Sequence, residues 1–182
     1  MTLTPRLNSA EALFKKLERE FVRTFHHKNL THKSDHFYNF CITSHSMHDH
    51  IAEMLGVITK DDKKNLFATW PANLYITAAA DIANSAKHFK LRRMNGALQP
   101  DRTKKIDRGR TTNYDVYVHP DGAIITKKRT NEPTFVVTLE NNDRVEITKF
   151  MMVVKDYWKS VVISNGVTPR RQSWSSLHGR AT

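Results

Sequence analysis

The chain has 182 residues, a formal net charge of +11 and a hydrophobic content of 39%. This length allows one domain or two small ones with an ordinary apolar core, and a charged fraction of 26% argues against wholesale disorder. No stretch reaches the roughly 18 apolar residues of a membrane helix, so we expect no membrane partner.

The cysteine content and the N-terminal residues bear on the cellular location of the protein. Cys41 is the single cysteine, so the chain cannot form an internal disulfide. The sequence starts with Met1-Thr-Leu-Thr-Pro-Arg, which lacks the basic-then-apolar order of a secretory signal. We therefore expect a reducing, cytoplasmic setting. No phosphate loop or other motif indicates a cofactor, and we expect none.

Helical periodicity dominates residues 1–91, which we predict to form a three-helix bundle. The first helix follows a cap at Asn8-Ser9, and its apolar stripe is Leu13, Phe14, Leu17, Phe21 and Phe25. The second helix is expected to open at Asp35 and to stop at Gly56, and the polar segment 60–65 reads as a connection. Trp70-Pro71 then introduces an alanine-rich third helix, Leu74 to Phe89.

The period changes to two at Thr112, which indicates strands. Turn-forming residues divide the segment that follows into strands at 112–118, 123–126, 134–139 and 144–148. A small antiparallel meander of this kind needs a partner, and helical spacing from Phe150 onward supplies one, with Met151, Val154, Trp158 and Val161 as its apolar face. The predicted fold class is therefore α+β, with this second part at 112–163.

The surplus positive charge is concentrated between and after these two parts. Residues 1–91 carry 12 basic against 9 acidic side chains, and 112–163 is balanced at 7 against 7. The remainder lies in a predicted basic loop, 92–111, and a predicted flexible tail, 164–182. The candidate nucleic-acid-binding residues are Arg92, Arg93, Arg102, Lys104, Lys105, Arg108, Arg110, Arg170 and Arg171. Cationic segments beside near-neutral folded parts favour capture of a polyanion.

A polar stripe follows one side of the third helix. Asp81, Asn84, Ser85 and His88 stand at i, i+3, i+4 and i+7, beside the apolar stripe of the same helix. One interpretation is a catalytic site, in which partial burial adjusts His88 for acid–base chemistry. The other is that these side chains cap or bridge neighbouring helices.

The second helix offers a metal-binding alternative. His45 with His48, and His45 with Asp49, have spacings that can present two ligands to one ion, and His88 or Asp81 would have to complete the set. The other interpretation places His45 and Asp49 in solvent and His48 in the core. We predict no metal.

The segment Ala83-Asn84-Ser85-Ala86-Lys87-His88 resembles the motif of HEPN-type helical domains, many of which are metal-independent ribonucleases acting as dimers. In the family motif an arginine, a polar residue and a histidine form the site; Asn84 and His88 match the last two. The arginine position is Ala83, or Asp81 in the longest spacing. The resemblance implies a helical bundle, a homodimer, and either ribonuclease activity or a nucleic-acid-binding relative without catalysis.

Three functional hypotheses follow. The first is a small accessory protein that binds RNA or DNA through the basic loop and tail. The second is a HEPN-like ribonuclease in which His88 is the general acid or base, Asp81 orients it and Asn84 assists. The third is a protein-interaction module or inhibitor of the phage or mobile-element type.

Overall fold

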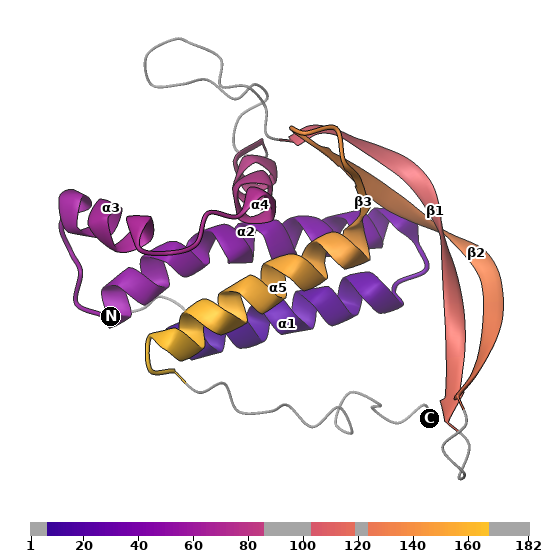
Figure 1. Cartoon of the computed structure of the whole chain (residues 1–182), viewed down its shortest axis with the longest axis horizontal. Helices are drawn as coiled ribbons and strands as arrows, with labels where there is room; N and C mark the ends of the chain where they lie inside the picture. Colours follow the sequence, from indigo (N-terminus) through magenta and orange to yellow (C-terminus); the bar gives the residue numbers. More distant parts are fainter. Residues whose placement is uncertain (1–6, 86–102, 119–123, 168–182) are drawn as a thin grey trace.

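The computed structural model describes residues 7–85, 103–118 and 124–167 of the chain, and it confirms the α+β class (Figure 1). An antiparallel sheet of order β1-β2-β3 packs against the last helix. The elements in chain order are α1 (Ala10–His26), α2 (Leu30–Met54), α3 (Lys60–Ala68), α4 (Leu74–Ser85), β1 (Thr103–Val118), β2 (Ile124–Leu139), β3 (Arg144–Glu146) and α5 (Ile147–Ser164).

Helix α5 lies along α1 and α2 and completes the helical bundle (Figure 1). Its Trp158 is fully buried, and Phe14 and Phe40 from α1 and α2 are among the other large buried side chains. The sheet contributes Val137 and Leu139 to the same hydrophobic cluster. The predicted parts 1–91 and 112–163 therefore share one core, which joins the sheet to the helices.

The beginnings of three helices depend on short side chains that accept backbone hydrogen bonds. Ser9 Oγ accepts from Ala12 N at 3.1 Å, as predicted for α1. The predicted start of α2 at Asp35 was wrong, because Asn29 Oδ1 already caps the helix by accepting from Thr31 N at 2.8 Å. The segment predicted as a polar connection contains α3, which Thr59 caps.

Strands β1 and β2 form a long two-stranded antiparallel arm, which we call the ribbon. Part of the predicted loop 92–111 is therefore wrong: from Thr103 onward it is strand, because its backbone pairs with β2. The predicted strands 123–126 and 134–139 are likewise one strand. Pro133 does not interrupt β2. At this position β2 pairs only with β1, and a proline is tolerated where one edge of the strand is unpaired.

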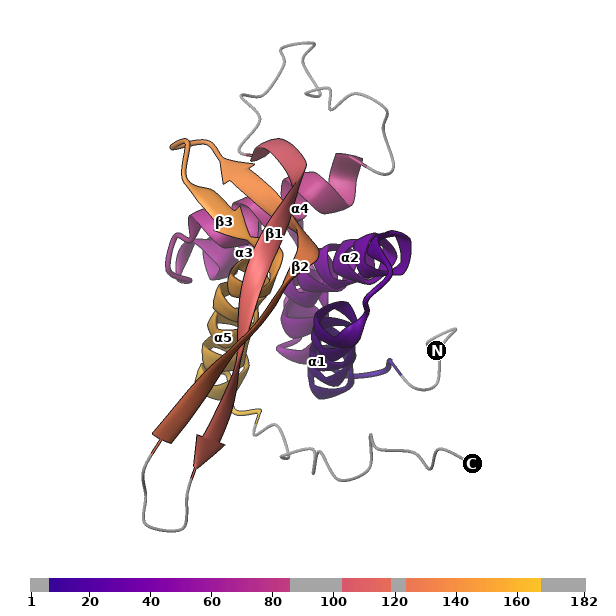
Figure 2. The ribbon, with the colours of Figure 1, turned by 90° about the vertical axis from the view of Figure 1, so that its right-hand side faces the viewer.

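The ribbon extends beyond the helices. Strand β3 pairs with β2 only from Val136 to Thr138, so the rest of β2 is paired with β1 alone. Each strand has 16 residues, which corresponds to about 50 Å of extended chain. Figure 2 shows that the half nearest the 119–123 connection runs past the bundle and has no helix on either face.

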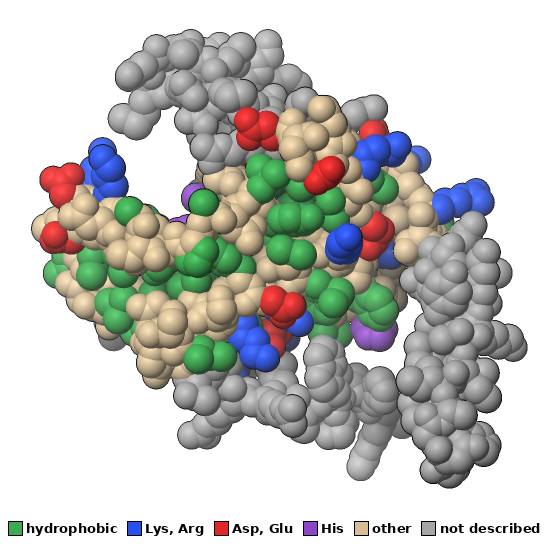
Figure 3. Space-filling view, viewed as in Figure 1, with side chains coloured by type: hydrophobic (Ala, Val, Ile, Leu, Met, Phe, Trp, Pro, Cys, Tyr) green, Lys and Arg blue, Asp and Glu red, His purple; other side chains and the backbone are tan. Residues whose placement is uncertain are grey.

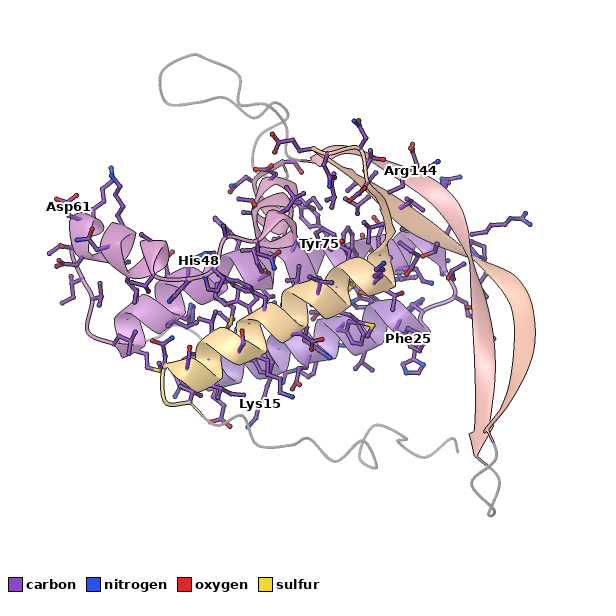
Figure 4. All side chains as sticks on the ribbon, viewed as in Figure 1. Lys15, Phe25, His48, Asp61, Tyr75 and Arg144 are labelled. Atoms are coloured by element: carbon purple, nitrogen blue, oxygen red, sulfur yellow. The ribbon has the colours of Figure 1, made fainter. Side chains whose placement is uncertain are left out.

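Two further corrections concern the ends of helices. Phe25, predicted in the buried stripe of α1, is 47% exposed at the end of the bundle beside the ribbon (Figure 4). The last helix begins at Ile147, where a strand was predicted to continue to Thr148, because Glu146 accepts from Thr148 N and caps α5. Among the described helices, none combines the length and apolar character needed to cross a membrane.

Candidate nucleic-acid interface

The excess charge of the described residues lies on the ribbon. The described residues outside it, 7–85 and 140–167, carry thirteen basic and thirteen acidic side chains, whereas the ribbon carries seven against three. On the face shown in Figure 3, basic and acidic groups of the helices are interspersed. The basic residues of the ribbon are Lys104, Lys105, Arg108, Arg110, Lys127, Lys128 and Arg129.

Arg108 and Arg110 are the two predicted binding residues whose side chains are described on the ribbon. Both are exposed, and their positions two apart place them on one face of β1. Gly109 between them lies against β2, where a β-carbon would stand 2.7 Å from Val136 Cγ2. Residue 109 therefore has to be a glycine, because β2 leaves no space for a side chain there. On either side of it, β1 presents the guanidinium groups of Arg108 and Arg110 to solvent.

The base of the ribbon is attached to two helices. Lys33 of α2 is buried, and its Nζ donates to the carbonyl oxygen of Pro133 at 3.4 Å. Thr134 is also buried and donates through Oγ1 to Glu146 Oε1 at 2.6 Å, while the same glutamate caps α5. Arg110 is the register partner of Pro133 and so lies beside this attachment. These contacts fix the direction in which the ribbon leaves the bundle.

A histidine cluster lies at the same end of the bundle. The His27 ring stacks on that of His32 with centroids 4.8 Å apart, and it lies 5.8 Å from the ring of His36. His36 Nδ1 is 2.9 Å from Glu20 Oε2, a buried carboxylate that orients the imidazole. Lys33, which contacts the ribbon, follows His32 directly in the sequence of α2.

Sequence reasoning missed this cluster and Lys33. His27 and His32 lie between the two predicted helices and were not considered, although the i, i+4 spacing of His32 and His36 was a usable signal. The contact of Lys33 with β2 joins residues 100 positions apart, and no local pattern indicates it.

The predicted polar stripe lies partly within the described residues. Asp81 and Asn84 are on α4 and are partly exposed, and Ser85 Oγ donates to the Ile82 carbonyl at 2.7 Å within the same helix. His88 lies outside the described residues. The ribonuclease hypothesis therefore stays a prediction, as does the resemblance on which it draws.

His48 has an aromatic environment. Its ring contacts Phe67, Trp70 and Trp158, with centroids 4.7 to 5.4 Å apart, and burial lowers the pKa of the imidazole. Its Nδ1 lies 3.3 Å from the carbonyl oxygen of His45. Figure 4 places it near the centre of the helical part, on α2.

Asp49, the third residue of the metal alternative, is exposed and pairs with Lys63 at 3.0 Å. Across 7–85, 103–118 and 124–167, no group of three or more His, Cys, Asp or Glu is placed to hold a metal ion. The structure therefore does not bring His45, His48 and Asp49 together as a ligand set.

Several candidate binding residues cannot be placed, because they lie outside the described residues: Arg92, Arg93, Arg102, Arg170 and Arg171. For Lys104 and Lys105, the structure places the backbone in β1.

No family model matches the chain, and no curated protein or solved structure matches it either. The function must therefore be argued from the residues themselves.

Proposed function

We propose that this protein binds nucleic acid through the basic ribbon. The observation that carries the proposal is the distribution of charge: within the described residues, the net positive charge belongs to β1 and β2, and the residues outside these two strands are balanced. Basic side chains that neutralise phosphates release condensed counterions, and this release drives binding without regard to base sequence.

The attachment of the ribbon supports the same proposal. Lys33 and Glu146 hold the base of the ribbon to α2 and to the start of α5. The exposed Arg108 and Arg110 are therefore held in a fixed position relative to the bundle. Charges held in this way lose less conformational entropy on binding than charges on an unattached segment. The ribbon also has no core of its own to bury, which leaves its surface available to a partner.

We assign this role to an accessory protein of the cytoplasm. The single cysteine, Cys41, is fully buried, and burial raises the pKa of its thiol. A buried, protonated thiol has the character of a small core residue in a reducing environment.

The test is a double variant, Arg108→Gln with Arg110→Gln, compared with a control, Lys60→Gln with Lys64→Gln on α3. Both pairs are exposed and remove the same charge, and α3 lies at the end of the bundle away from the ribbon (Figure 4). If both arginines contact phosphates, the slope of log K against log salt becomes shallower by about 1.8, and affinity near 0.1 M salt falls roughly 10- to 100-fold.

The measurement is fluorescence anisotropy of a labelled nucleic acid between about 50 and 200 mM salt. The control variant is expected to keep most of the affinity of the unmodified protein, and both variants to keep its thermal stability. Equal losses in the two variants would mean that overall charge alone attracts the probe. Unchanged binding by the Arg108/Arg110 variant, or no binding by the unmodified protein, would remove the proposal.

A further inference from the structure

The geometry of the ribbon points to its ligand, and we propose that it inserts into the major groove of double-stranded DNA. This inference rests on the proposed function and adds the class of nucleic acid and the mode of contact. It draws on three features of the described residues: the width of the ribbon, the spread of its basic positions and its bulge.

The width of the ribbon fits one groove. Two paired strands lie about 4.8 Å apart, and the major groove of B-form DNA, about 12 Å wide, admits a two-stranded ribbon with its side chains. The major groove of double-stranded RNA is deep and narrow and excludes such an element.

The basic positions are spread over a suitable length. Arg108 and Arg110 lie near the base, and Lys128 and Lys127 pair with Tyr114 and Asp115 farther along. The six residue steps from Arg108 to Tyr114 correspond to about 20 Å of strand, so the two groups meet different stretches of the groove. Because Arg108 and Arg110 are on β1 and Lys127 and Lys128 are on β2, a ribbon lying along the groove carries basic residues on both strands, with one strand toward each wall.

A bulge lies between these two groups of basic residues. Between the pairs Thr112–Asn131 and Tyr114–Lys128, β2 has two residues, Arg129 and Thr130, opposite Asn113 alone. A bulge of this kind bends the strand and increases its right-handed twist. Two-stranded ribbons already twist more than larger sheets, so the bulge helps the ribbon to follow a winding groove.

The test compares three probes of the same sequence and about 20 base pairs, which is roughly two turns of B-form DNA. They are a plain DNA duplex, an RNA duplex, and a DNA duplex whose cytosines carry a glucosylated hydroxymethyl group at C5. The added group is uncharged and fills the major groove, where C5 lies. We expect the plain DNA duplex to bind at least about tenfold more tightly than either other probe, since groove contacts add to the shared phosphate term.

The outcomes separate the two proposals. Equal binding of plain and glucosylated DNA would overturn groove insertion and leave binding to phosphates intact. Equal or tighter binding of the RNA duplex would overturn the choice of DNA. No binding to any probe would remove the proposed function, and groove insertion with it. The Arg108→Gln/Arg110→Gln variant should bind the plain duplex more weakly but still prefer it to the glucosylated one, because Lys127 and Lys128 remain.

Discussion

The hydrogen bond between Trp158 and Ser44 ties α5 to α2, and its removal should measurably destabilise the protein. Trp158 Nε1 donates to Ser44 Oγ at 2.8 Å, and both side chains are at most 1% exposed. The substitution Ser44→Ala leaves the indole N–H without this acceptor. Because the site is buried, solvent does not readily replace the lost hydroxyl.

The expected loss follows from two opposing contributions. A buried donor without a partner costs about 1–3 kcal/mol, whereas alanine gains about 0.5 kcal/mol over serine in a helix. The net decrease in the free energy of unfolding should be about 0.5–2.5 kcal/mol. This is a substantial fraction of the 5–15 kcal/mol typical of folded domains, so it is easily measured.

The assay is urea unfolding followed by tryptophan fluorescence, with Ser46→Ala as the matched control. Ser46 lies two residues along the same helix, but its Oγ donates to the Ile42 carbonyl at 3.0 Å and thus stays within α2. We expect Ser46→Ala to leave the urea midpoint nearly unchanged and Ser44→Ala to lower it. Equal midpoints for the two variants would refute the claim that this contact holds α5 in the bundle.

Three other predictions concern the ribbon, His48 and Cys41. Gly109→Ala puts a methyl group 2.7 Å from Val136 Cγ2 and should destabilise the ribbon by about 1–3 kcal/mol. The loss should be measurable as faster amide hydrogen exchange in β1. Adding Val136→Ala, which removes the clashing methyl group, should recover part of the lost stability. Burial lowers the pKa of His48, so the unfolded state binds its proton more readily. Stability should therefore fall as pH drops below about 6.5, by at most about 1.4 kcal/mol per pH unit, and His48→Gln should flatten this dependence; identical pH profiles would contradict it. The buried Cys41 thiol should resist a disulfide reagent in the native protein and react on unfolding in urea; immediate native reaction would show that it is accessible.

The helical core was largely predictable from the sequence. Apolar residues at three- and four-residue spacing marked the buried faces of α1, α2 and α5, and Trp158 was identified as a core residue. Such spacing is a local property of the sequence, so it can be recognised without knowing which element the helix packs against. The short α3 escaped prediction because it buries none of its residues and is marked chiefly by its cap, Thr59.

The ribbon could not be predicted in full, because its pairing is not local. Arg108 pairs with Phe135, 27 positions farther along, and a segment rich in charged residues carries little strand preference by itself. The basic residues of β1 were singled out as a charged segment but assigned to a loop, and Lys127, Lys128 and Arg129 of β2 were not singled out. A loop and a ribbon present charges very differently, since the strand period alone places Arg108 and Arg110 on one face.

The contacts at the base of the ribbon were beyond sequence reasoning for the same reason. Lys33 meets Pro133 and Glu20 meets His36 only once the helices and strands have packed. A buried lysine and a buried glutamate read as ordinary surface residues in a sequence.

The central claim, that the ribbon holds nucleic acid, is tested most directly by mapping backbone amide shifts in NMR spectra as a DNA duplex is added. We predict that the largest changes fall within 103–118 and 124–139, with Arg108 and Arg110 among them, and that α3 and the middle of α5 change little. Changes confined to the helices would contradict the account even if the DNA were bound.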